Sequence, residues 1–552
     1  MKVFAILFLT FCSLQSKAQL SSKSIFTKAD TLRGALNENR DWWDVLHYDI
    51  EVAPNITTKR LVGTTTIKAL VINSSKSSIA QIDLQQPLIL ESVTLNNFTK
   101  LKFTQKDNVC LIELENEIKK LKENDTFYLT LNYHGQPQIA NNPPWDGGWI
   151  WKKDKSGRPF VSVACQGLGA SSWYPCKDHQ SDEPQLGATL HIIVPDSLVA
   201  IGNGIQTQSQ KHENSITYTW QVKNPINSYN IVPYIGKYVN FTDTFMGIKG
   251  KLDLSYWVLD YNREKALQHF SQVKQMLRAF EYWFGAYPFY EDGYKLVESP
   301  HLGMEHQSNI AYGNKFNNGY LGRDLSGTGW GLKWDFIIVH ESGHEWFANN
   351  ITTADIADMW VHEGFTCYSE TLFTEYYFGK EAGNEYCNGL RKNIQNDKPI
   401  IGPYGVNKEG SGDMYYKAAN MIHSIRHTMN DDEKFRQMLI ALNTKFYQSI
   451  VTTQQIESFI NEYTGINFNG TFNQYLRASN IPSFEFYFKG KKLHYRYLDC
   501  VDDFDLPLTF GTKTIYPTKE LKTKRIRKKF LSNYTKEKIE KMYLLKVIQK
   551  SI

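Results

Sequence analysis

The segment FIIVHESGHEWFANN, residues 336–350, places two histidines and two glutamates within six positions. His340 and His344 flank Glu341 in the pattern H-E-x-x-H. Histidines four residues apart project from one face of a helix, one turn apart, so both imidazoles can reach a single zinc ion. The apolar residues just before them, WDFIIV, can bury such a helix. The spacing therefore predicts a zinc site on a buried helix.

A zinc ion in a hydrolytic site needs a third protein ligand and one open position for water. The helical stretch DMWVHEGFTCYSETLF offers Glu363, with 18 residues between it and His344. That interval is long enough for a turn and an antiparallel helix that returns to the metal. Asp335, Glu345 and His362 are the alternatives for this role.

Helix geometry disfavours two of these alternatives. Glu345 follows His344 directly and is rotated by about 100° around the helix, so it should point away from the metal. His362 could only replace Glu363, because adjacent residues of a helix do not share a face. We expect Glu345 and His362 to lie at the surface or to support the ligands from behind.

Glu341 stands next to His340, off the ligand face but close to it. A carboxylate there can touch a water molecule at the metal without binding the metal itself. It can take a proton from that water as the water attacks a carbonyl, and then pass the proton to a leaving amine. The chemistry that these residues imply is amide hydrolysis.

The region from about residue 40 to 245 alternates as strands do. VLHYDIEVAP places Tyr48, Ile50 and Val52 on one face, and LVGTTTIKALVIN and LILESVTLN are rich in β-branched residues. GGWIWKK and RPFVSVACQ flank a turn sequence, Asp154 to Gly157. A large antiparallel β domain is the simplest explanation.

The pattern changes near residue 262, where apolar residues recur at helical spacing. They are Leu267, Phe270, Val273, Leu277, Phe280 and Phe284, and Gly285 should end this helix. Short strand-like pieces follow, and then helices dominate to about residue 478. Beyond Pro482, the alternation in FEFYFKGKKLHYRYLD predicts a β-hairpin.

Composition and length fit a folded protein of several domains. The chain has 552 residues, of which 41% are hydrophobic, 14% aromatic and 22% charged. Lys2, an apolar run from Val3 to Leu14, and Ser16-Lys17-Ala18 resemble a cleaved secretory signal, with a buried N-terminal segment as the alternative. Export to the periplasm or the outside of the cell follows from this interpretation. No other stretch is apolar for long enough to span a membrane.

These observations divide the chain into four parts. We expect a signal peptide over residues 1–18, an antiparallel β domain over 19–245, an α+β catalytic domain over 246–480, and a short C-terminal β unit with a basic tail over 481–552. The net charge of +5 comes from that tail, because Lys519 to Ile552 contains 12 Lys and Arg against 3 Glu. Such a tail could bind nucleic acid or an anionic surface, but we expect a solvated or frayed terminus and no nucleic-acid partner. No C-x-x-C pair occurs, which argues against a cysteine-rich zinc site.

Four segments together resemble the zinc aminopeptidases of the aminopeptidase N and leukotriene-hydrolase kind, which are gluzincin metallopeptidases. HESGHEWFANNIT followed by MWVHEGF is similar to the H-E-x-x-H of that family and its distant glutamate. LGMEHQ (302–307) resembles its Gly-x-Met-Glu-Asn element, and YYKAANMI (415–422) its Tyr-x-Lys-Gly segment. ACQGLGASSWYPCKDHQSDEP (164–184) resembles the end of its N-terminal β domain. Order and spacing agree from about residue 40 to 480.

The resemblance implies a thermolysin-like catalytic domain that acts on peptides with a free N-terminus. It implies that one zinc ion is bound by His340, His344 and Glu363, that Glu341 is the general base, that Tyr415 stabilises the oxyanion, and that the substrate is held by Glu305, Gln166, Gly303 and Met304. A carboxylate beside a catalytic zinc can capture an ammonium group, and this restricts a peptidase to N-termini. A glycine in the edge strand lets the substrate backbone approach closely.

The sequence also departs from the family pattern. Leu302 and His306 replace the first glycine and the final asparagine of the Gly-x-Met-Glu-Asn element, and Ala418 stands where glycine is usual. Tyr416 competes with Tyr415, although the offset to the following lysine favours Tyr415. About 70 residues follow residue 480, so we expect the large helical C-terminal cap of the family to be missing and the site to be more open.

Other functions remain open at this point. An endopeptidase or an epoxide hydrolase of the leukotriene type would use similar zinc ligands. An internal peptide bond has no free amine to satisfy Glu305 and Gln166, which argues against an endopeptidase. A peptide-binding scaffold with a dead site is a third alternative, and the complete set of ligands, base and tyrosine argues against it. The sequence therefore favours an exported zinc aminopeptidase.

Overall fold

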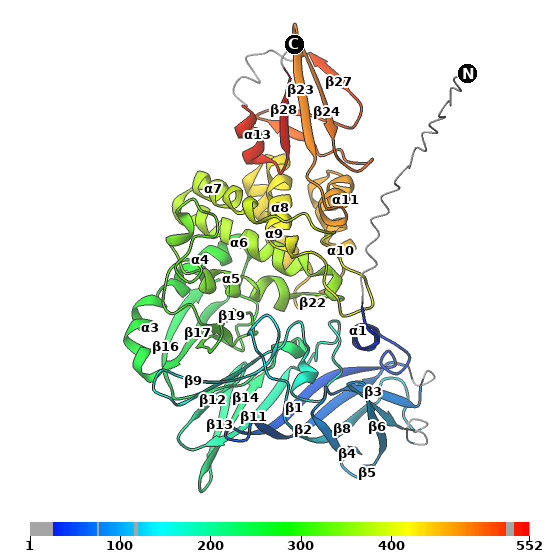
Figure 1. Ribbon diagram of the computed structural model, residues 1–552, viewed down its shortest axis with the longest axis vertical. Coiled ribbons are helices and arrows are strands. Elements are labelled where there is room, and N and C mark those ends of the chain that lie inside the picture. The colour runs from blue at the N-terminus through cyan, green and yellow to red at the C-terminus, as the bar shows by residue number, and fades with distance from the viewer. Residues whose placement is uncertain (1–25, 74–76, 115–116, 118–119, 526–534, 551–552) are drawn as a thin grey trace, which may run out of the picture.

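The computed structural model describes residues 26–550 except 74–76, 115–116, 118–119 and 526–534. The predicted signal peptide lies outside the described residues. Three parts follow one another along the long axis of the molecule (Figure 1). The β-rich part occupies one end, helices occupy the middle, and a small C-terminal sheet occupies the other end. This order confirms the predicted fold class.

An eight-stranded sheet forms the main layer of the N-terminal part. Its order is β13 (Ile205–Lys211), β14 (Ser215–Val222), β11 (Ala188–Pro195), β1 (Trp43–Asn55), β2 (Arg60–Val71), β8 (Thr126–Gly135), β4 (Ile89–Leu95) and β5 (Thr99–Lys100). Neighbours are antiparallel except β1 and β11, which run parallel with Tyr48 opposite Ala188. Tyr48, Ile50 and Val52 are fully buried, so the predicted inner face of β1 is confirmed.

Two smaller sheets complete the N-terminal part. One has the order β12 (Val199–Ile201), β15 (Tyr234–Gly236), β10 (Pro159–Ala164) and β9 (Gly148–Lys153). The other has the order β3 (Ile79–Asp83), β7 (Val109–Glu113) and β6 (Lys102–Lys106). One continuous hydrophobic cluster joins these sheets to the main one. The short helix α1 (Lys28–Gly34) lies where the N-terminal part meets the helices (Figure 1).

The part that is predicted to be catalytic begins with a five-stranded sheet. Its order is β16 (Tyr238–Gly247), β17 (Gly250–Leu259), β18 (Tyr294–Glu298), β20 (Ile310–Tyr312) and β19 (Gly303–Met304). β16 and β17 pair along their whole length. The sheet therefore begins at Tyr238, before residue 245, where the sequence predicts the end of the N-terminal β domain. Two further strands, β21 (Ile351–Thr353) and β22 (Ser449–Val451), form a parallel pair.

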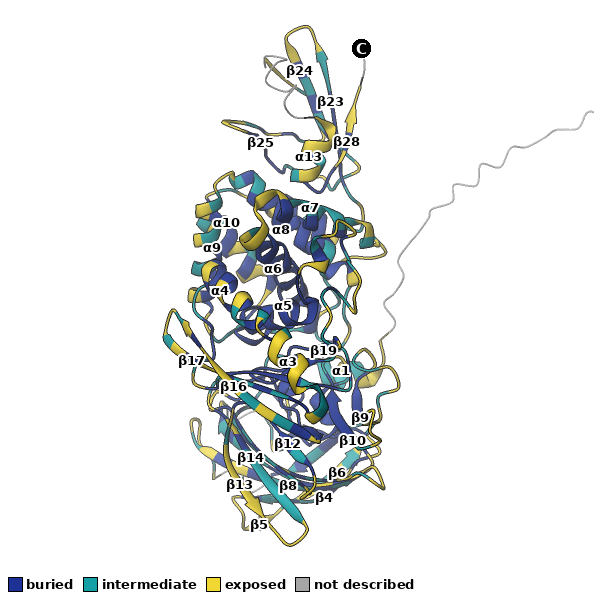
Figure 2. Ribbon diagram, turned by 90° about the vertical axis from the view of Figure 1, so that its left-hand side faces the viewer, coloured by how far each residue is buried: buried dark blue, intermediate teal, exposed yellow. Residues whose placement is uncertain are grey.

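Helices cover this sheet and build the middle of the molecule (Figures 1 and 2). They are α3 (Arg263–His269), α4 (Gln272–Phe284), α5 (Phe336–Gly343), α6 (Trp360–Phe378), α7 (Lys380–Leu390), α8 (Tyr416–Met429), α9 (Asp432–Lys445), α10 (Thr453–Thr464) and α11 (Asn469–Arg477). The burial colours show α5 and α6 as almost wholly buried (Figure 2). Both helices that carry the predicted ligands therefore lie in the core.

The predicted helix from residue 262 is two helices, α3 and α4. Phe270 and Ser271 separate them, and the Phe270 ring packs 4.9 Å from that of Tyr312. Leu267 on α3 is 40% exposed, so the apolar stripe is not continuous across the break. Gly285 ends α4 with a φ of 90°, as the sequence predicts.

The C-terminal unit contains the predicted hairpin, β23 (Ser483–Lys489) and β24 (Lys492–Leu498), with Phe484 opposite Tyr497. Its sheet has the order β27 (Lys522–Arg525), β24, β23 and β28 (Lys546–Gln549). It also holds β25 (Leu508–Phe510), β26 (Lys513–Ile515) and α13 (Lys536–Met542).

The sequence predicts a solvated or frayed tail; in the described residues Lys522–Arg525 is mostly exposed, but the prediction of fraying is wrong. β27 pairs with β24 and β28 pairs with β23, and Tyr543 and Val547 are buried. Apolar side chains that lie between the charged residues are buried and anchor this segment. The net charge of the tail contains no information on these apolar residues. Among the residues that the structure describes, no helix is long and apolar enough to cross a bilayer. In the same residues the six cysteines are unpaired.

Candidate active site

Helix α5 carries the H-E-x-x-H segment and is buried along its whole length. Asp335 caps its N-terminus by accepting hydrogen bonds from the backbone N–H groups of Ile337 and Ile338 at 2.9 and 3.2 Å. The same carboxylate accepts a hydrogen bond from Tyr312 at 2.8 Å. Asp335 therefore fixes the start of the helix, and the alternative of Asp335 as a metal ligand does not fit this geometry.

His340, His344 and Glu363 converge on one point. Glu363 lies in the first turn of α6, and its Oε2 is 3.8 Å from Nε2 of His340 and 3.4 Å from Nε2 of His344. The three ligand atoms lie within 4.8 Å of one another. Among the described residues, Oε2 of Glu363 is buried without a hydrogen-bond partner. An orphaned carboxylate oxygen facing two imidazole nitrogens is the donor set that a catalytic zinc ion takes, so these residues fit the metal.

The other ring nitrogen of each histidine is already engaged. Nδ1 of His340 donates to Oε1 of Glu370 at 2.7 Å, and Nδ1 of His344 donates to the carbonyl of Phe347 at 3.0 Å. Glu370 is held in turn by the hydroxyl of Tyr386 at 2.6 Å. These contacts turn both Nε2 atoms toward Glu363. Sequence reasoning missed Glu370, although it follows Glu363 by two helical turns on α6 and so lies on nearly the same face.

Several carboxylates surround the predicted ligands, and their negative charge favours binding of a divalent cation. Burial alone would lower the pKa of the His344 imidazole, but the carboxylates of Glu363, Glu305 and Glu341 outweigh burial and raise that pKa to about 10. Burial also works against ionisation of Glu363, yet the neighbouring His344 holds the pKa of that carboxyl below its usual range. The cluster therefore favours a bound positive charge.

Glu345 and His362 point away from this cluster, as the helix geometry predicts. Glu345 accepts hydrogen bonds from the Tyr287 hydroxyl at 2.7 Å and from the backbone N–H of Ser308 at 3.1 Å. Nε2 of His362 accepts a hydrogen bond from the backbone N–H of Thr353 at 2.9 Å. Both residues are buried, so the surface position that was one expectation for them does not occur.

Glu341 and Tyr415 line the same cavity as the predicted ligands, a space of about 430 Å³. The Tyr415 ring stacks over that of His340 with 6.1 Å between centroids. Tyr416 also lines the cavity, and after burial itself the groups that raise its pKa are Cys367 and Glu370. For Tyr415 the corresponding group is Glu363. The structure thus places Tyr415 nearer to the metal-binding candidates.

Glu305 lies beside Glu341 and His344 and is tied to the β domain. Its Oε1 accepts hydrogen bonds from Gln166 at 2.6 Å and from the Tyr229 hydroxyl at 2.9 Å. Ligand atoms of Glu305, Glu341 and His344 also lie within 4.8 Å of one another. Glu305 already has two donors, whereas Oε2 of Glu363 has none among the described residues, so the first cluster is the better metal site. Tyr229 has no sequence signal, because only the fold brings it to Glu305.

Gly303 and Met304 form β19, one of the two edge strands of the five-stranded sheet in the described part of the chain. Both residues line the cavity. Leu302, which replaces a glycine of the family pattern, lines it as well. His306 does not, because its side chain is fully buried and its Nδ1 lies 2.5 Å from the Tyr234 hydroxyl. The histidine at position 306, where the family pattern has asparagine, is thus packed in the core next to Glu305 and does not change the lining of the cavity.

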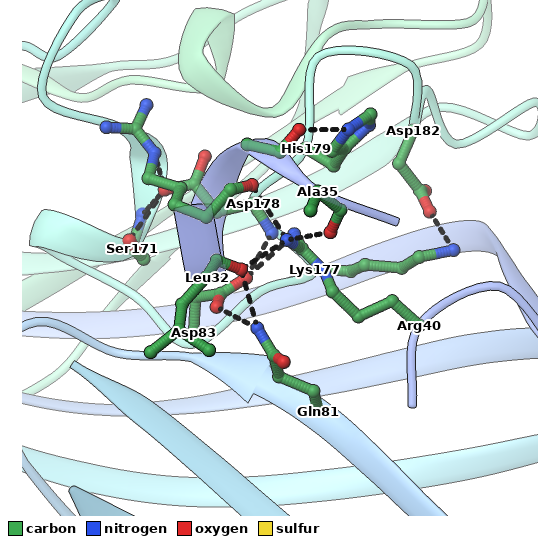
Figure 3. A network of polar contacts seen from close by, with 12 residues as sticks. Leu32, Ala35, Arg40, Gln81, Asp83, Ser171, Lys177, Asp178, His179 and Asp182 are labelled. Atoms are coloured by element: carbon green, nitrogen blue, oxygen red, sulfur yellow. Dashed lines mark hydrogen bonds and ion pairs between the residues drawn. The ribbon is translucent and has the colours of Figure 1, made fainter. Parts of the chain in front are cut away.

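A buried polar network connects Arg40, Asp83 and Asp178 near helix α1 (Figure 3). Arg40 is fully buried, donates to the carbonyls of Leu32, Arg33 and Ala35 at the end of α1, and pairs with Asp83 at 2.9 Å. Arg33 pairs with Asp178 at 3.2 Å and donates to the carbonyls of Gly167 and Leu168. Helix α1 therefore clamps the backbone just after Gln166.

Comparison with known proteins gives two family matches in the expected order. Residues 45–230 match the peptidase M1 N-terminal domain, and residues 270–475 match the peptidase family M1 domain. Aminopeptidase B of Mus musculus is 24% identical over 387 residues, covering 66% of this chain and 53% of the mouse protein. Leukotriene A-4 hydrolase of Xenopus laevis is 21% identical over 450 residues, covering 76% of this chain and 68% of that protein. The chain spans about half the length of the first curated relatives that it matches.

Solved structures show the same architecture. A variant of an M1 zinc metallopeptidase from Deinococcus radiodurans, bound to a Tyr-Ser-Ala substrate, superposes with a TM-score of 0.64 at 20% identity, covering 80% of this chain and 96% of that one. Yeast leukotriene A-4 hydrolase superposes with a TM-score of 0.63 at 17% identity, covering 78% and 68%. At these identities the superposition shows the fold alone. The two domain matches, in order along most of the chain, show that this protein belongs to peptidase family M1.

Proposed function

We propose that this protein is a zinc-dependent aminopeptidase that removes the N-terminal residue of peptides. His340, His344 and Glu363 would hold one zinc ion, which when bound would polarise the substrate carbonyl and the attacking water. The observation that carries the proposal is the position of Glu305. Its carboxylate stands beside the metal-binding candidates and is held there by Gln166 and Tyr229 from the β domain.

The predicted site residues in the cavity then have separate tasks. Glu341 accepts a proton from the attacking water and later delivers it to the leaving amine. The Tyr415 hydroxyl donates a hydrogen bond to the oxygen that becomes negative in the transition state. Glu305 binds the substrate ammonium, so that the first peptide bond and no later one reaches Glu341. The edge strand at Gly303 and Met304 gives the substrate backbone a partner.

Zinc content and the requirement for a free amine test this proposal together. Mass spectrometry of the native protein should find one zinc per chain, and arylamides of free amino acids should be hydrolysed while their N-acetylated forms should not. Glu341→Gln is the matched control, because it should keep the zinc and lose turnover. Equal hydrolysis of free and acetylated substrates would make the protein an endopeptidase. Absence of both zinc and turnover would leave only the scaffold alternative.

We also propose that the protein is exported, which rests only on the first 18 residues and the small residues that end them. N-terminal sequencing of the protein recovered from its native cells should begin near Gln19. A chain that retains Met1 or Lys2 would contradict export by a cleaved signal.

A further inference from the structure

The small C-terminal sheet has one buried face and one outer face. Phe484 and Phe486 on β23 and Leu493 and Tyr495 on β24 are buried in the core. Because successive residues of a strand point to opposite faces, the residues that alternate with them form the outer face. The strands place one acid and five bases on that face. The acid is Glu485, and the bases are Lys489, Lys492, Arg496, Arg525 and Lys546.

Three of these bases lie in one row across three strands. Lys492 on β24 stands opposite Lys489 on β23 and opposite Arg525 on β27. Neighbouring strands lie about 4.8 Å apart, and like charges directly opposite each other destabilise a sheet. All three residues are exposed, and among the described residues none of them has an ion pair, in contrast to Arg496. The row therefore costs stability unless an anion outside the chain neutralises it.

Protection of a sheet edge does not explain this row. Lysines on edge strands keep other sheets from pairing there, but β23 and β24 are inner strands of the described sheet. The acid on the face does not balance the row either. Glu485 pairs with Arg496 at 2.9 Å and with Lys550 at 2.5 Å, so its charge is already matched. The outer face keeps an excess of positive charge.

The pairing of the tail fixes these charges in space. A frayed tail would spread its lysines through solvent, whereas β27 and β28 hold theirs on one sheet. This sheet forms one end of the molecule, while α5 and α6, which carry the predicted ligands, lie in the middle (Figures 1 and 2). A partner can therefore cover the outer face and leave the cavity open.

Apolar and aromatic groups lie between the charges on the same face. Ile548 on β28 stands opposite Glu485 and is 38% exposed. Tyr487 and His494 stack, with ring centroids 4.8 Å apart and 8° between the ring planes. Because each ring covers one face of the other, the pair is poorly suited to stack on the bases of a nucleic acid. Basic residues around apolar and aromatic groups are typical of surfaces that bind an anionic bilayer.

We propose that the outer face of the C-terminal sheet binds the surface of a membrane that contains anionic phospholipids. The lipid phosphates neutralise the row of Lys489, Lys492 and Arg525, and Ile548 contacts the headgroup region. The protein is then held by one end, and its cavity stays open to peptides. This inference goes beyond the proposed function and needs neither zinc nor turnover.

The test is co-sedimentation of the protein, recovered from its native cells, with vesicles of two compositions. We expect binding to vesicles of phosphatidylcholine and phosphatidylglycerol in equal parts, loss of that binding at high salt, and no binding to phosphatidylcholine alone. Joint replacement of Lys489→Gln and Lys492→Gln should weaken binding about 25-fold, because each basic residue near an anionic surface contributes about fivefold.

A matched control removes the same charge elsewhere. Lys100→Gln with Lys102→Gln changes two exposed lysines on β5 and β6 of the β domain and should leave vesicle binding at the parent level. The Lys489 and Lys492 variant should melt no lower than the parent, because its substitutions relieve repulsion. If it melts lower, Arg525→Gln with Lys546→Gln replaces it and should reproduce the loss of binding.

Three results would overturn the inference. The first is an absence of binding to the phosphatidylglycerol vesicles. The second is an equal loss of binding in the control pair, which would show that net charge and not this face is responsible. The third is tighter binding to oligo-deoxythymidine than to the vesicles at the same salt concentration, which would make single-stranded nucleic acid the partner. Failure of the protein to hydrolyse arylamides would overturn the proposed function and leave this inference intact.

Discussion

The space that Glu341 occupies is the space that a side chain at Gly303 would need. A Cβ on Gly303 would lie 2.5 Å from Oε1 of Glu341 and 2.9 Å from Cδ1 of Ile337. The backbone of Gly303 cannot move away from Glu341, because β19 pairs with β20 at Tyr312. The edge strand that would guide the substrate and the proposed general base are thus fitted to each other. Glycine at position 303 serves the base as well as the backbone of a bound peptide.

Gly303→Ala should therefore displace the Glu341 carboxylate and leave the metal site intact. We expect kcat to fall at least about tenfold, because proton transfer depends on the position of the base, while zinc content stays at the parent level. Steady-state kinetics and mass spectrometry measure the two quantities. An unchanged kcat would show that the carboxylate does not act from the place where the structure puts it.

Glu370 should govern the affinity for zinc without binding the metal. It fixes His340 through Nδ1, and loss of such a contact lowers metal affinity roughly 10- to 100-fold. Glu370→Ala should show this loss in competition with a chelator of known affinity. Tyr386→Phe removes the hydroxyl that holds Glu370 and should act in the same direction but more weakly. Full zinc affinity in Glu370→Ala would contradict the assignment.

The predicted ligands could be found from the sequence because helical spacing places them. His340 and His344 are separated by one turn, and the exclusion of Glu345 and His362 needed only the rotation per residue. The contact between Glu305 and Tyr229 could not be predicted from the sequence, because Tyr229 lies in a short turn 76 residues earlier in the chain. No local pattern marks such a residue. Contacts of this kind depend on how the β domain docks against the catalytic part.

In the C-terminal unit, too, contacts between neighbouring residues could be predicted from the sequence, and contacts between distant residues could not. Alternating aromatic residues predicted the hairpin of β23 and β24, including its turn at Gly490. The charges of the tail predict a solvated or frayed terminus. Pairing of β28 with β23 depends on Tyr543 and Val547 reaching a core built by distant residues. Charge counts describe the solvent face and miss such anchors.

Tyr415 and Tyr416 can be separated by one matched pair of variants. Tyr415→Phe should lower kcat by about a hundredfold or more, because a hydroxyl that donates to the oxyanion acts only in the transition state. Tyr416→Phe should have a much smaller effect, since the ring that stacks over His340 is that of Tyr415. KM and zinc content should change little in both variants. The reverse order of effects would assign the oxyanion contact to Tyr416.

Arg33 should position Gln166 without touching the substrate. Its guanidinium pairs with Asp178 and donates to the carbonyls of Gly167 and Leu168, directly after the residue that holds Glu305. Arg33→Ala should therefore loosen the amine-binding side of the cavity and spare the metal side. We expect KM for free arylamides to rise several-fold while kcat and zinc content stay close to the parent values.

Two further variants separate positioning from general stability. Arg158→Ala breaks a surface pair with Asp260, which joins the β domain to the catalytic part away from the cavity, and should leave KM unchanged even if the melting temperature falls. Arg33→Lys keeps a positive charge but loses the planar guanidinium, whose Nε pairs with Asp178 while Nη1 donates to two carbonyls, so it should restore KM only in part. If Arg33→Ala lowered the melting temperature with no change in KM, α1 would be a structural clamp alone. A rise in KM that tracks Gln166→Ala would instead show that α1 reaches the substrate through the Gln166 loop.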